Sequence, residues 1–165
     1  MHADETNAEL LVFTFKEGLL AKLAHDLKLK LGKFSLELDG EALAGVFDLT
    51  TLKVVTPRRD GVDDAGLLPT RFYSEIEKNA REDVLETKKY PTARFAAAVG
   101  ASAVAGQLTL HGQTMPVRCT LKETEKERIA EAWLDVRDFG ITPYSAMLGT
   151  LKVKPKVQVV VTVKK

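Results

Sequence analysis

The residues that could do chemistry in this 165-residue chain are few and far apart. A zinc site needs three or four converging His, Cys or carboxylate ligands. The three histidines, His2, His25 and His111, are widely separated, and the chain has no HxH, HExxH or CxxC spacing. It has no phosphate-binding P-loop or GxGxxG motif either. The sequence therefore predicts no metal site and no bound cofactor.

Candidates for a nucleophile or a general base are equally weak. The single cysteine, Cys119, is in phase with Val117 and Leu121, which indicates a buried, apolar position. His25 and Asp26 are adjacent, and adjacent residues of a strand point to opposite faces. An enzyme with His25 as its base is therefore the least favoured hypothesis, and we expect no catalytic residue.

Composition and charge describe an ordinary globular domain. Hydrophobic residues make up 45% and charged residues 28%, and 24 Lys and Arg against 23 Asp and Glu leave a net charge of +1. Such a balance gives no field to attract nucleic acid. No apolar run reaches the roughly 18 residues of a membrane span. The first residues do not resemble a signal peptide, so we expect a cytoplasmic protein, or a periplasmic one if a leader is missing from the sequence.

Period-two alternation dominates the chain and predicts strands with one apolar face. In the long run Asp26–Asp39 the apolar phase changes at Gly32, which we interpret as a β-bulge in one bent strand. Seven further runs bring the strand candidates to eight: Glu9–Phe15, Val46–Thr50, Ala93–Val99, Val104–His111, Met115–Thr124, Arg128–Val136 and Lys152–Val163. Eight antiparallel strands joined by Gly-containing turns can close into a barrel.

Two segments do not alternate. Gly18–Ala24 predicts a short helical turn. Thr70–Thr87 predicts a helix, since its apolar residues recur at four-residue intervals: Phe72, Ile76, Ala80 and Val84. The chain has no internal repeat or linker, so residues 1–165 predict one domain, with residues 1–8 as a flexible tail.

The inward faces of such a barrel would mix medium-sized side chains with small ones. Small residues interrupt the apolar faces at Ala93, Ala97, Gly106 and Ala132. A packed core and a ligand cavity fit this pattern equally well. For a cavity, the candidate lining residues are Leu27, Leu29, Leu31, Phe47, Phe95, Leu108, Leu110 and Val159. Arg58, Arg59 or Lys78 would then contact a ligand headgroup.

Four blocks of sequence occur in a characteristic order along residues 24–163. They are Ala24–Leu27 leading into Gly32–Phe34, then Lys88–Phe95, Gly106–Val117 and Asp138–Ile141. In this order they resemble the bacterial YceI-like family of lipocalin-like proteins associated with binding polyisoprenoid lipids. The hairpin Gly106–Val117 is the most specific of the four.

The resemblance implies an eight-stranded antiparallel barrel crossed by a helix, with a long apolar channel for a prenyl chain. It implies a non-enzymatic protein that binds or transports an isoprenoid-type lipid, such as a polyprenyl phosphate or an isoprenoid quinone. The alternative is a structural or protein-interaction domain with a filled barrel and no ligand. The sequence leaves the oligomeric state open, a dimer included.

Overall fold

The computed structural model describes residues 1–18 and 25–165, which are mainly strand. A helical segment contains α1 (Tyr73–Lys78), and short 3-10 turns lie at Leu49–Thr51, Ala65–Leu67, Val136–Phe139 and Met147–Gly149. All strand pairs in this part of the chain are antiparallel. The mainly β, antiparallel fold predicted from the alternating pattern is therefore confirmed. The helical turn predicted at Gly18–Ala24 falls on residues 19–24 and lies outside the described residues.

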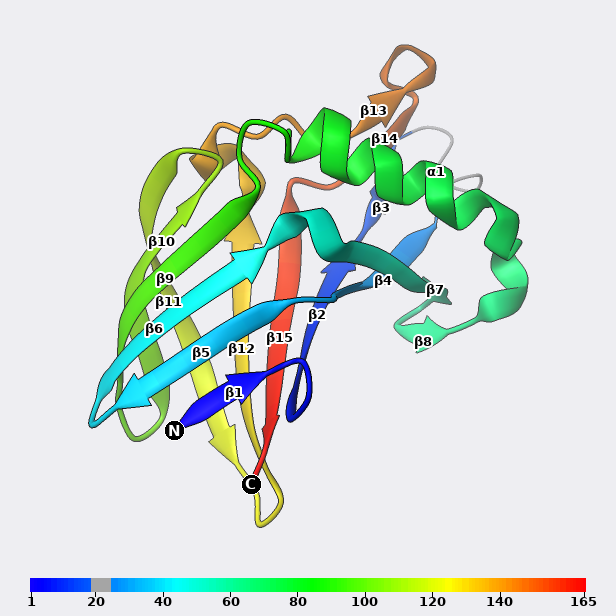
Figure 1. The fold of residues 1–165 in the computed structure, drawn as a ribbon. Helices are drawn as coiled ribbons and strands as arrows, with labels where there is room; N and C mark the ends of the chain where they lie inside the picture. The colour runs from blue at the N-terminus through cyan, green and yellow to red at the C-terminus, as the bar shows by residue number, and fades with distance from the viewer. Residues whose placement is uncertain (19–24) are drawn as a thin grey trace.

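A twelve-stranded sheet forms the body of the molecule and curls strongly on itself (Figure 1). Its strands pair in the order β1-β5-β6-β9-β10-β11-β12-β15-β2-β4-β7-β8. The bounds are β1 His2–Asp4, β2 Ala8–Thr14, β4 Asp26–Leu31, β5 Phe34–Asp39, β6 Ala42–Asp48, β7 Leu52–Arg59, β8 Val62–Asp63, β9 Thr92–Val99, β10 Ala103–Leu110, β11 Gln113–Glu123, β12 Glu127–Asp135 and β15 Lys156–Lys164. This sheet has β1 and β8 as its outer strands, so the eight-stranded barrel stays a prediction at this point.

A second, three-stranded sheet lies beyond the end of the main one. It contains β3 (Lys16–Glu17), β13 (Ser145–Ala146) and β14 (Leu151–Val153), in the order β13-β14-β3. The run Lys152–Val163, predicted as one strand, is thus divided between β14 and β15 at Lys154 and Pro155. Proline cannot donate the hydrogen bond that a continuous strand needs there.

The long run Asp26–Asp39 is also divided, at the glycine where its apolar phase changes. Strand β4 ends at Leu31 and β5 begins at Phe34, and both of these side chains are buried. Between them, the Gly32 and Lys33 N–H groups donate to Thr51 Oγ1 at 3.1 and 2.9 Å. The interruption keeps the apolar face inward on both sides of the bend, as the bulge interpretation predicted.

The helical segment predicted at Thr70–Thr87 is present, but it ends at Val84 and combines three kinds of turn. A 3-10 turn over Thr70–Phe72 leads into α1, Tyr73–Lys78, and π-helical turns follow over Asn79–Val84. The segment crosses one end of the curled sheet, and both chain termini lie at the other end (Figure 1). The predicted inner face is confirmed at Ile76, Ala80 and Val84. It is wrong at Phe72, which is 39% exposed, and Tyr73 packs against the core instead.

Hydrogen bonds join this helical segment to β7 and to the 3-10 turn Leu49–Thr51 that precedes it. The Glu77 carboxylate accepts from the Val54 N–H of β7 at 3.2 Å. The Arg81 guanidinium donates through Nη1 to Thr50 O at 3.0 Å. The segment is therefore fixed to the sheet by polar contacts as well as by its apolar face.

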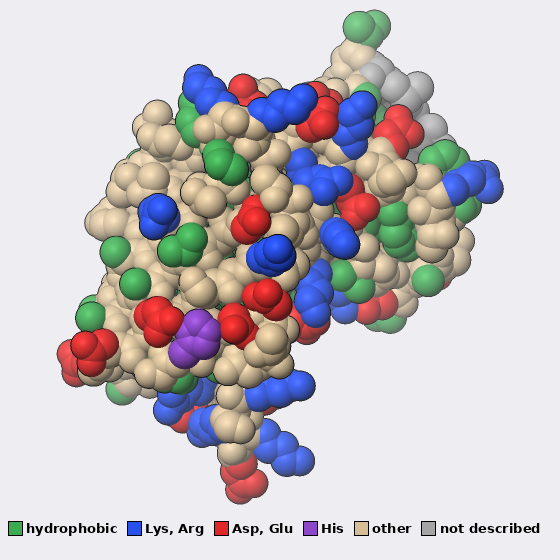
Figure 2. All heavy atoms as spheres, in the orientation of Figure 1, with side chains coloured by type: hydrophobic (Ala, Val, Ile, Leu, Met, Phe, Trp, Pro, Cys, Tyr) green, Lys and Arg blue, Asp and Glu red, His purple; other side chains and the backbone are tan. Residues whose placement is uncertain are grey.

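Side chains on the sheet follow the predicted inward and outward alternation. On β12, Ala132 is buried, whereas Trp133 is 55% exposed and stacks on Phe15 with 5.5 Å between ring centroids. Trp133 therefore points outward, away from the interior of the sheet. On the face drawn in Figure 2, basic and acidic side chains are intermixed, which agrees with the net charge of +1.

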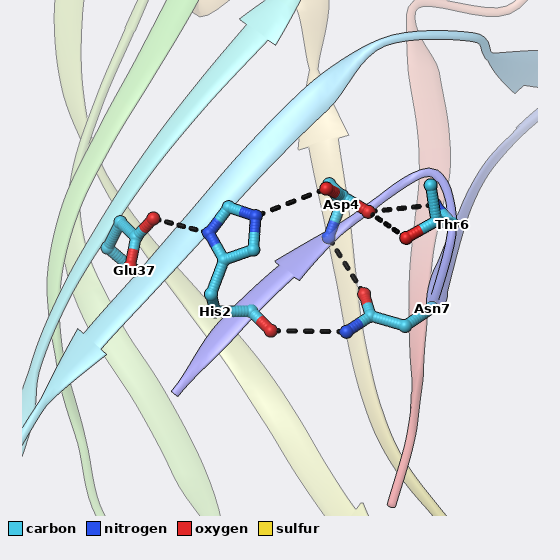
Figure 3. Close-up of polar contacts among 5 residues, drawn as sticks. All are labelled: His2, Asp4, Thr6, Asn7 and Glu37. Atoms are coloured by element: carbon cyan, nitrogen blue, oxygen red, sulfur yellow. Dashed lines mark hydrogen bonds and ion pairs between the residues drawn. The ribbon is translucent and has the colours of Figure 1, made fainter.

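Residues 2–4 form an outer strand of the sheet and a turn joins them to β2 at Ala8, in contrast to the flexible tail that the sequence suggested. Strand β1 pairs with β5, and Ala3 is fully buried. The His2 ring contacts the Glu37 carboxylate through Nδ1, and its Nε2 lies 3.1 Å from Asp4 Oδ2 (Figure 3). Asp4 Oδ1 also accepts from the Thr6 hydroxyl at 2.6 Å. These polar contacts hold β1 against its neighbour.

Within residues 1–18 and 25–165, no helix has both the length and the apolar character needed to cross a membrane.

Candidate ligand-binding cavity

A cavity of about 500 Å³ occupies the interior of the curled sheet. Its wall consists of the inward-facing side chains of β2, β4, β5, β6, β7, β9, β10, β11, β12 and β15, and nearly all of them are apolar. On β15 these are Val157, Val159, Val161 and Val163, which span about 20 Å at the usual rise of a strand. The volume lies within the range of about 300–1,000 Å³ typical of ligand pockets.

One end of the cavity is closed by the helical segment and the loops beneath it. Ala80, Val84 and Leu85 line the cavity from this side. Below them, a buried cluster fills the space between the helical segment and the sheet: Leu49, Ala93, Leu110, Phe139 and Ile141. The π-helical turn, with the Leu85 N–H donating to Ala80 O at 2.9 Å, lets the consecutive residues Val84 and Leu85 both contribute to this closure.

A hydrogen-bonded clamp fixes the strand ends next to this closure. His111 Nε2 lies 2.5 Å from Glu86 Oε2, just after the helical segment, and its ring packs against Tyr90 at 4.3 Å between centroids. His111 Nδ1 lies 3.3 Å from Phe139 O. The clamp therefore joins the β10–β11 turn to two other segments at the closed end, which is a structural role.

The opposite end of the cavity reaches solvent. Gly100, Ala101 and Met1 are exposed and also line the cavity. Glu123 and Arg128 line it as well, and their side chains are 51% and 41% exposed. They face each other across β11 and β12, with Arg128 Nε 3.0 Å from Glu123 Oε1. The cavity is thus apolar along its length and charged at its open end.

Of the eight candidate lining residues, all except Leu27 line this cavity: Leu29, Leu31, Phe47, Phe95, Leu108, Leu110 and Val159. Leu27 packs against the adjoining apolar cluster instead. The residues considered as headgroup contacts do not line the cavity. Arg58 pairs with Asp63 at 3.1 Å and stacks over the Phe13 ring, whereas Arg59 lies 3.9 Å from Asp64. Lys78 is an exposed residue at the end of α1.

Sequence reasoning missed the polar or polarisable residues of the cavity wall, which are Thr14, Cys119, Glu123 and Arg128. The available signal was strand phase, because Val117, Cys119, Leu121 and Glu123 share one face of β11. Burial of Cys119 raises the pKa of its thiol. A hydrogen bond from Lys165, together with the one from Arg128, lowers the pKa of Glu123.

Among the described residues, no side chain is seen as a hydrogen-bond partner that would make His25 a catalytic base. Its ring is partly buried, and this burial, with the nearby charges of Lys16 and Arg59, lowers its pKa. His25 is not among the residues that line the cavity. In the described part of the chain, no three His, Cys, Asp or Glu side chains are grouped closely enough to hold a metal ion.

Comparison with known proteins places this chain in a family. The YceI-like domain model matches residues 7–164, and the chain therefore belongs to the YceI-like family, as the sequence blocks suggested. The comparison with curated proteins found no match.

Solved structures share the fold at low sequence identity. A polyisoprenoid-binding domain from Saccharophagus degradans, implicated in plant cell wall breakdown, has 11% identity and a TM-score of 0.62, covering 99% of this chain and 97% of that one. Burkholderia cenocepacia BcnA has 16% identity and a TM-score of 0.59, covering 96% of both chains. A mutant CJ YceI protein with a monobromobimane guest has 11% identity and a TM-score of 0.55, covering 84% of each chain.

Proposed function

We propose that this protein binds the isoprenoid chain of a lipid within its cavity and acts as a non-enzymatic carrier. One observation supports this most strongly: the interior of the sheet contains a continuous apolar cavity of about 500 Å³. A filled interior would have favoured the alternative, a purely structural or protein-interaction domain. Family membership, and the polyisoprenoid-binding domain among the similar structures, point in the same direction.

We also propose that the sheet forms an eight-stranded barrel. Strands β4 and β5 are consecutive parts of one bent strand, and β6 and β7 are consecutive parts of another. Strand β4 pairs with both β2 and β7, and β6 pairs with β9. When each bent strand is counted once, the pairings run in a ring through β2, β4–β5, β6–β7, β9, β10, β11, β12 and β15 and return to β2.

The driving force for binding would be burial of apolar surface. Each methylene group transferred from water contributes about 0.8 kcal/mol before the cost of ordering the chain is subtracted. A flexible chain also needs a wall without regular polar contacts, and leucine, valine and phenylalanine side chains provide one here. Selectivity for chain type would therefore depend on the shape and length of the cavity.

The test is organic extraction of the purified protein and mass spectrometry of the extract against a mock-purified control. Wild-type protein is expected to release a stoichiometric prenyl lipid. The double variant Leu29→Glu, Leu108→Glu places two carboxylates in the cavity wall and should release none. Its matched control, Val55→Glu with Ala105→Glu, adds the same charges at exposed positions of β7 and β10 and should retain the lipid.

A second variant guards against loss of folding. Ala130 lines the cavity opposite Val161, so Ala130→Phe should fill part of it while keeping the core apolar. This variant should fold and lose lipid. Retention of stoichiometric lipid by folded Ala130→Phe and by the folded double variant would show that the ligand lies elsewhere.

A further inference from the structure

We infer that the bound lipid carries an anionic, phosphate-type headgroup and that Arg128 binds it at the open end of the cavity. This inference rests on the proposed function and adds to it the chemical class of the headgroup and the residue that recognises it. The charged residues of the cavity wall, their position and their unused hydrogen-bonding groups support it in turn.

Within the described residues, the charged side chains of the cavity wall are Glu123 and Arg128, and both lie at the open end. A phosphate group cannot enter the apolar part, because burying an unpaired charge is very costly. A lipid with its tail inside must therefore leave its headgroup beside these two residues.

Arg128 has donors to spare for an oxyanion. Its Nε donates to Glu123 Oε1 at 3.0 Å, and its Nη1 has only the Met1 sulfur, at 3.5 Å, as an acceptor. Sulfur is a weak acceptor. Among the described residues, no acceptor is seen for Nη2. Two adjacent guanidinium nitrogens can thus donate together to two oxygens of a phosphate, the geometry for which arginine is best suited.

The carboxylate of Glu123 does not cancel this positive site. Lys165 Nζ lies 2.7 Å from Glu123 Oε1 and also donates to Thr124 O at 2.6 Å. Two side-chain cations, Arg128 and Lys165, therefore share the Glu123 carboxylate. When a headgroup binds Arg128, Lys165 still compensates Glu123.

A simple cross-strand ion pair is the structural alternative for Arg128 and Glu123. An exposed pair of this kind contributes little to stability, and it would do so equally well on the outer face. Here the pair continues the inward face on which Leu121 and Ala130 line the cavity. An arginine at the end of an apolar channel is positioned to meet the polar end of an amphipathic ligand.

The experiment compares two ligands with the same tail, farnesyl phosphate and farnesol. Wild-type protein is expected to bind the phosphate about tenfold or more tightly than the alcohol, as one charge-assisted pair would give. Arg128→Met keeps the length of the side chain and should remove this preference, so that the variant binds the phosphate and the alcohol with similar dissociation constants. The matched control is Arg118→Met, at an exposed position of β11, which should keep the preference for the phosphate.

Two further measurements sharpen the outcome. Glu123→Gln should strengthen phosphate binding severalfold, because it releases Arg128 and Lys165. Raising the salt concentration should weaken the binding of farnesyl phosphate and leave the binding of farnesol unchanged. If wild type and Arg128→Met bind farnesol with no preference for the phosphate, this inference is overturned and the proposed function stands. If wild type binds neither compound, both are overturned.

Discussion

Cys119 has an unusual position for the single cysteine of a chain. It lines the cavity from β11, and its burial raises the pKa of the thiol. Only the thiolate reacts with disulfide reagents, so the thiol should be slow to react near neutral pH. Because its side chain contacts the space that a ligand would fill, its reactivity should report whether the cavity is occupied.

This leads to a prediction for thiol labelling. The reaction of Cys119 with Ellman's reagent at pH 8 should be slower than that of a model thiol, and saturating farnesol should slow it further. The measurement is the rate of absorbance change, with denatured protein defining full reaction. In the control, Cys119→Ser with Thr120→Cys, the thiol is on the exposed face. This thiol should react quickly, at a rate that farnesol does not change. Equal rates for both proteins would contradict the orientation of Cys119 into the cavity.

Among the secondary-structure elements, β1 has polar side-chain contacts that depend on pH, beside its backbone pairing with β5. The Glu37 carboxylate, with Asp4, raises the pKa of His2 above its ordinary 6.5. The Thr6 hydroxyl, with the Thr6 N–H and His2, lowers the pKa of Asp4 to about 2 from 3.8. The His2 contribution is complete below pH 6.5 and is lost as pH rises through its higher folded value. The Asp4 contribution is complete above pH 3.8 and is lost as pH falls toward about 2.

Pairing of β1 with β5 should therefore be strongest between about pH 4 and 6.5. The protection of the Ala3 and Leu38 amides against hydrogen exchange, corrected for the intrinsic rate at each pH, measures it. Protection should fall on both sides of this window, whereas the Leu108 amide of β10 should not respond. His2→Gln should abolish the loss at higher pH, and a wild-type profile in this variant would assign the effect to another group.

The elements differ in how well sequence could predict them. The strands around the cavity were predictable because one of their faces is apolar, and period two shows this directly. Strand β7 was missed, since Val55 is exposed and Pro57 is buried, which breaks the alternation. Strand β1 was missed because its three residues depend on a partner about thirty positions away. The inner face of the helical segment was misassigned at Phe72, because a 3-10 turn precedes α1 and a π-helical stretch follows it, so a single four-residue spacing cannot describe the segment.

The candidate site was predictable to a similar degree. Strand phase selected lining residues from β4, β6, β9, β10 and β15, since inward-facing residues of a curled sheet share one cavity. Whether that space is filled depends on curvature and on side-chain packing, which no local pattern encodes. Arg128 was overlooked because a charged residue at the end of an alternating run looks like an ordinary strand terminus. The location of the protein in the cell stays a prediction.

For the whole molecule, a ligand in the cavity should stabilise the fold. A ligand at one hundred times its dissociation constant adds about 2.7 kcal/mol to the free energy of unfolding. For a chain of this size that corresponds to a rise in melting temperature of roughly 5–10 °C. Farnesyl phosphate should produce this shift in wild type by scanning calorimetry. Ala130→Phe should melt at or above the temperature of ligand-free wild type and show no shift; an equal shift in both proteins would mean binding outside the cavity.

The closure of the cavity at the helical segment sets an order of events for any lipid that uses it. The cavity is open at one end only, so a lipid chain must enter with its far end first and leave with its headgroup first. Chains shorter than the channel would leave its closed end empty, and longer ones would hold their headgroup outside the open end. Because the cavity has a single opening, its depth limits the length of chain that it can hold. We expect affinity to rise with each added isoprene unit until the far end of the chain touches Val84 and Leu85, and then to stop rising.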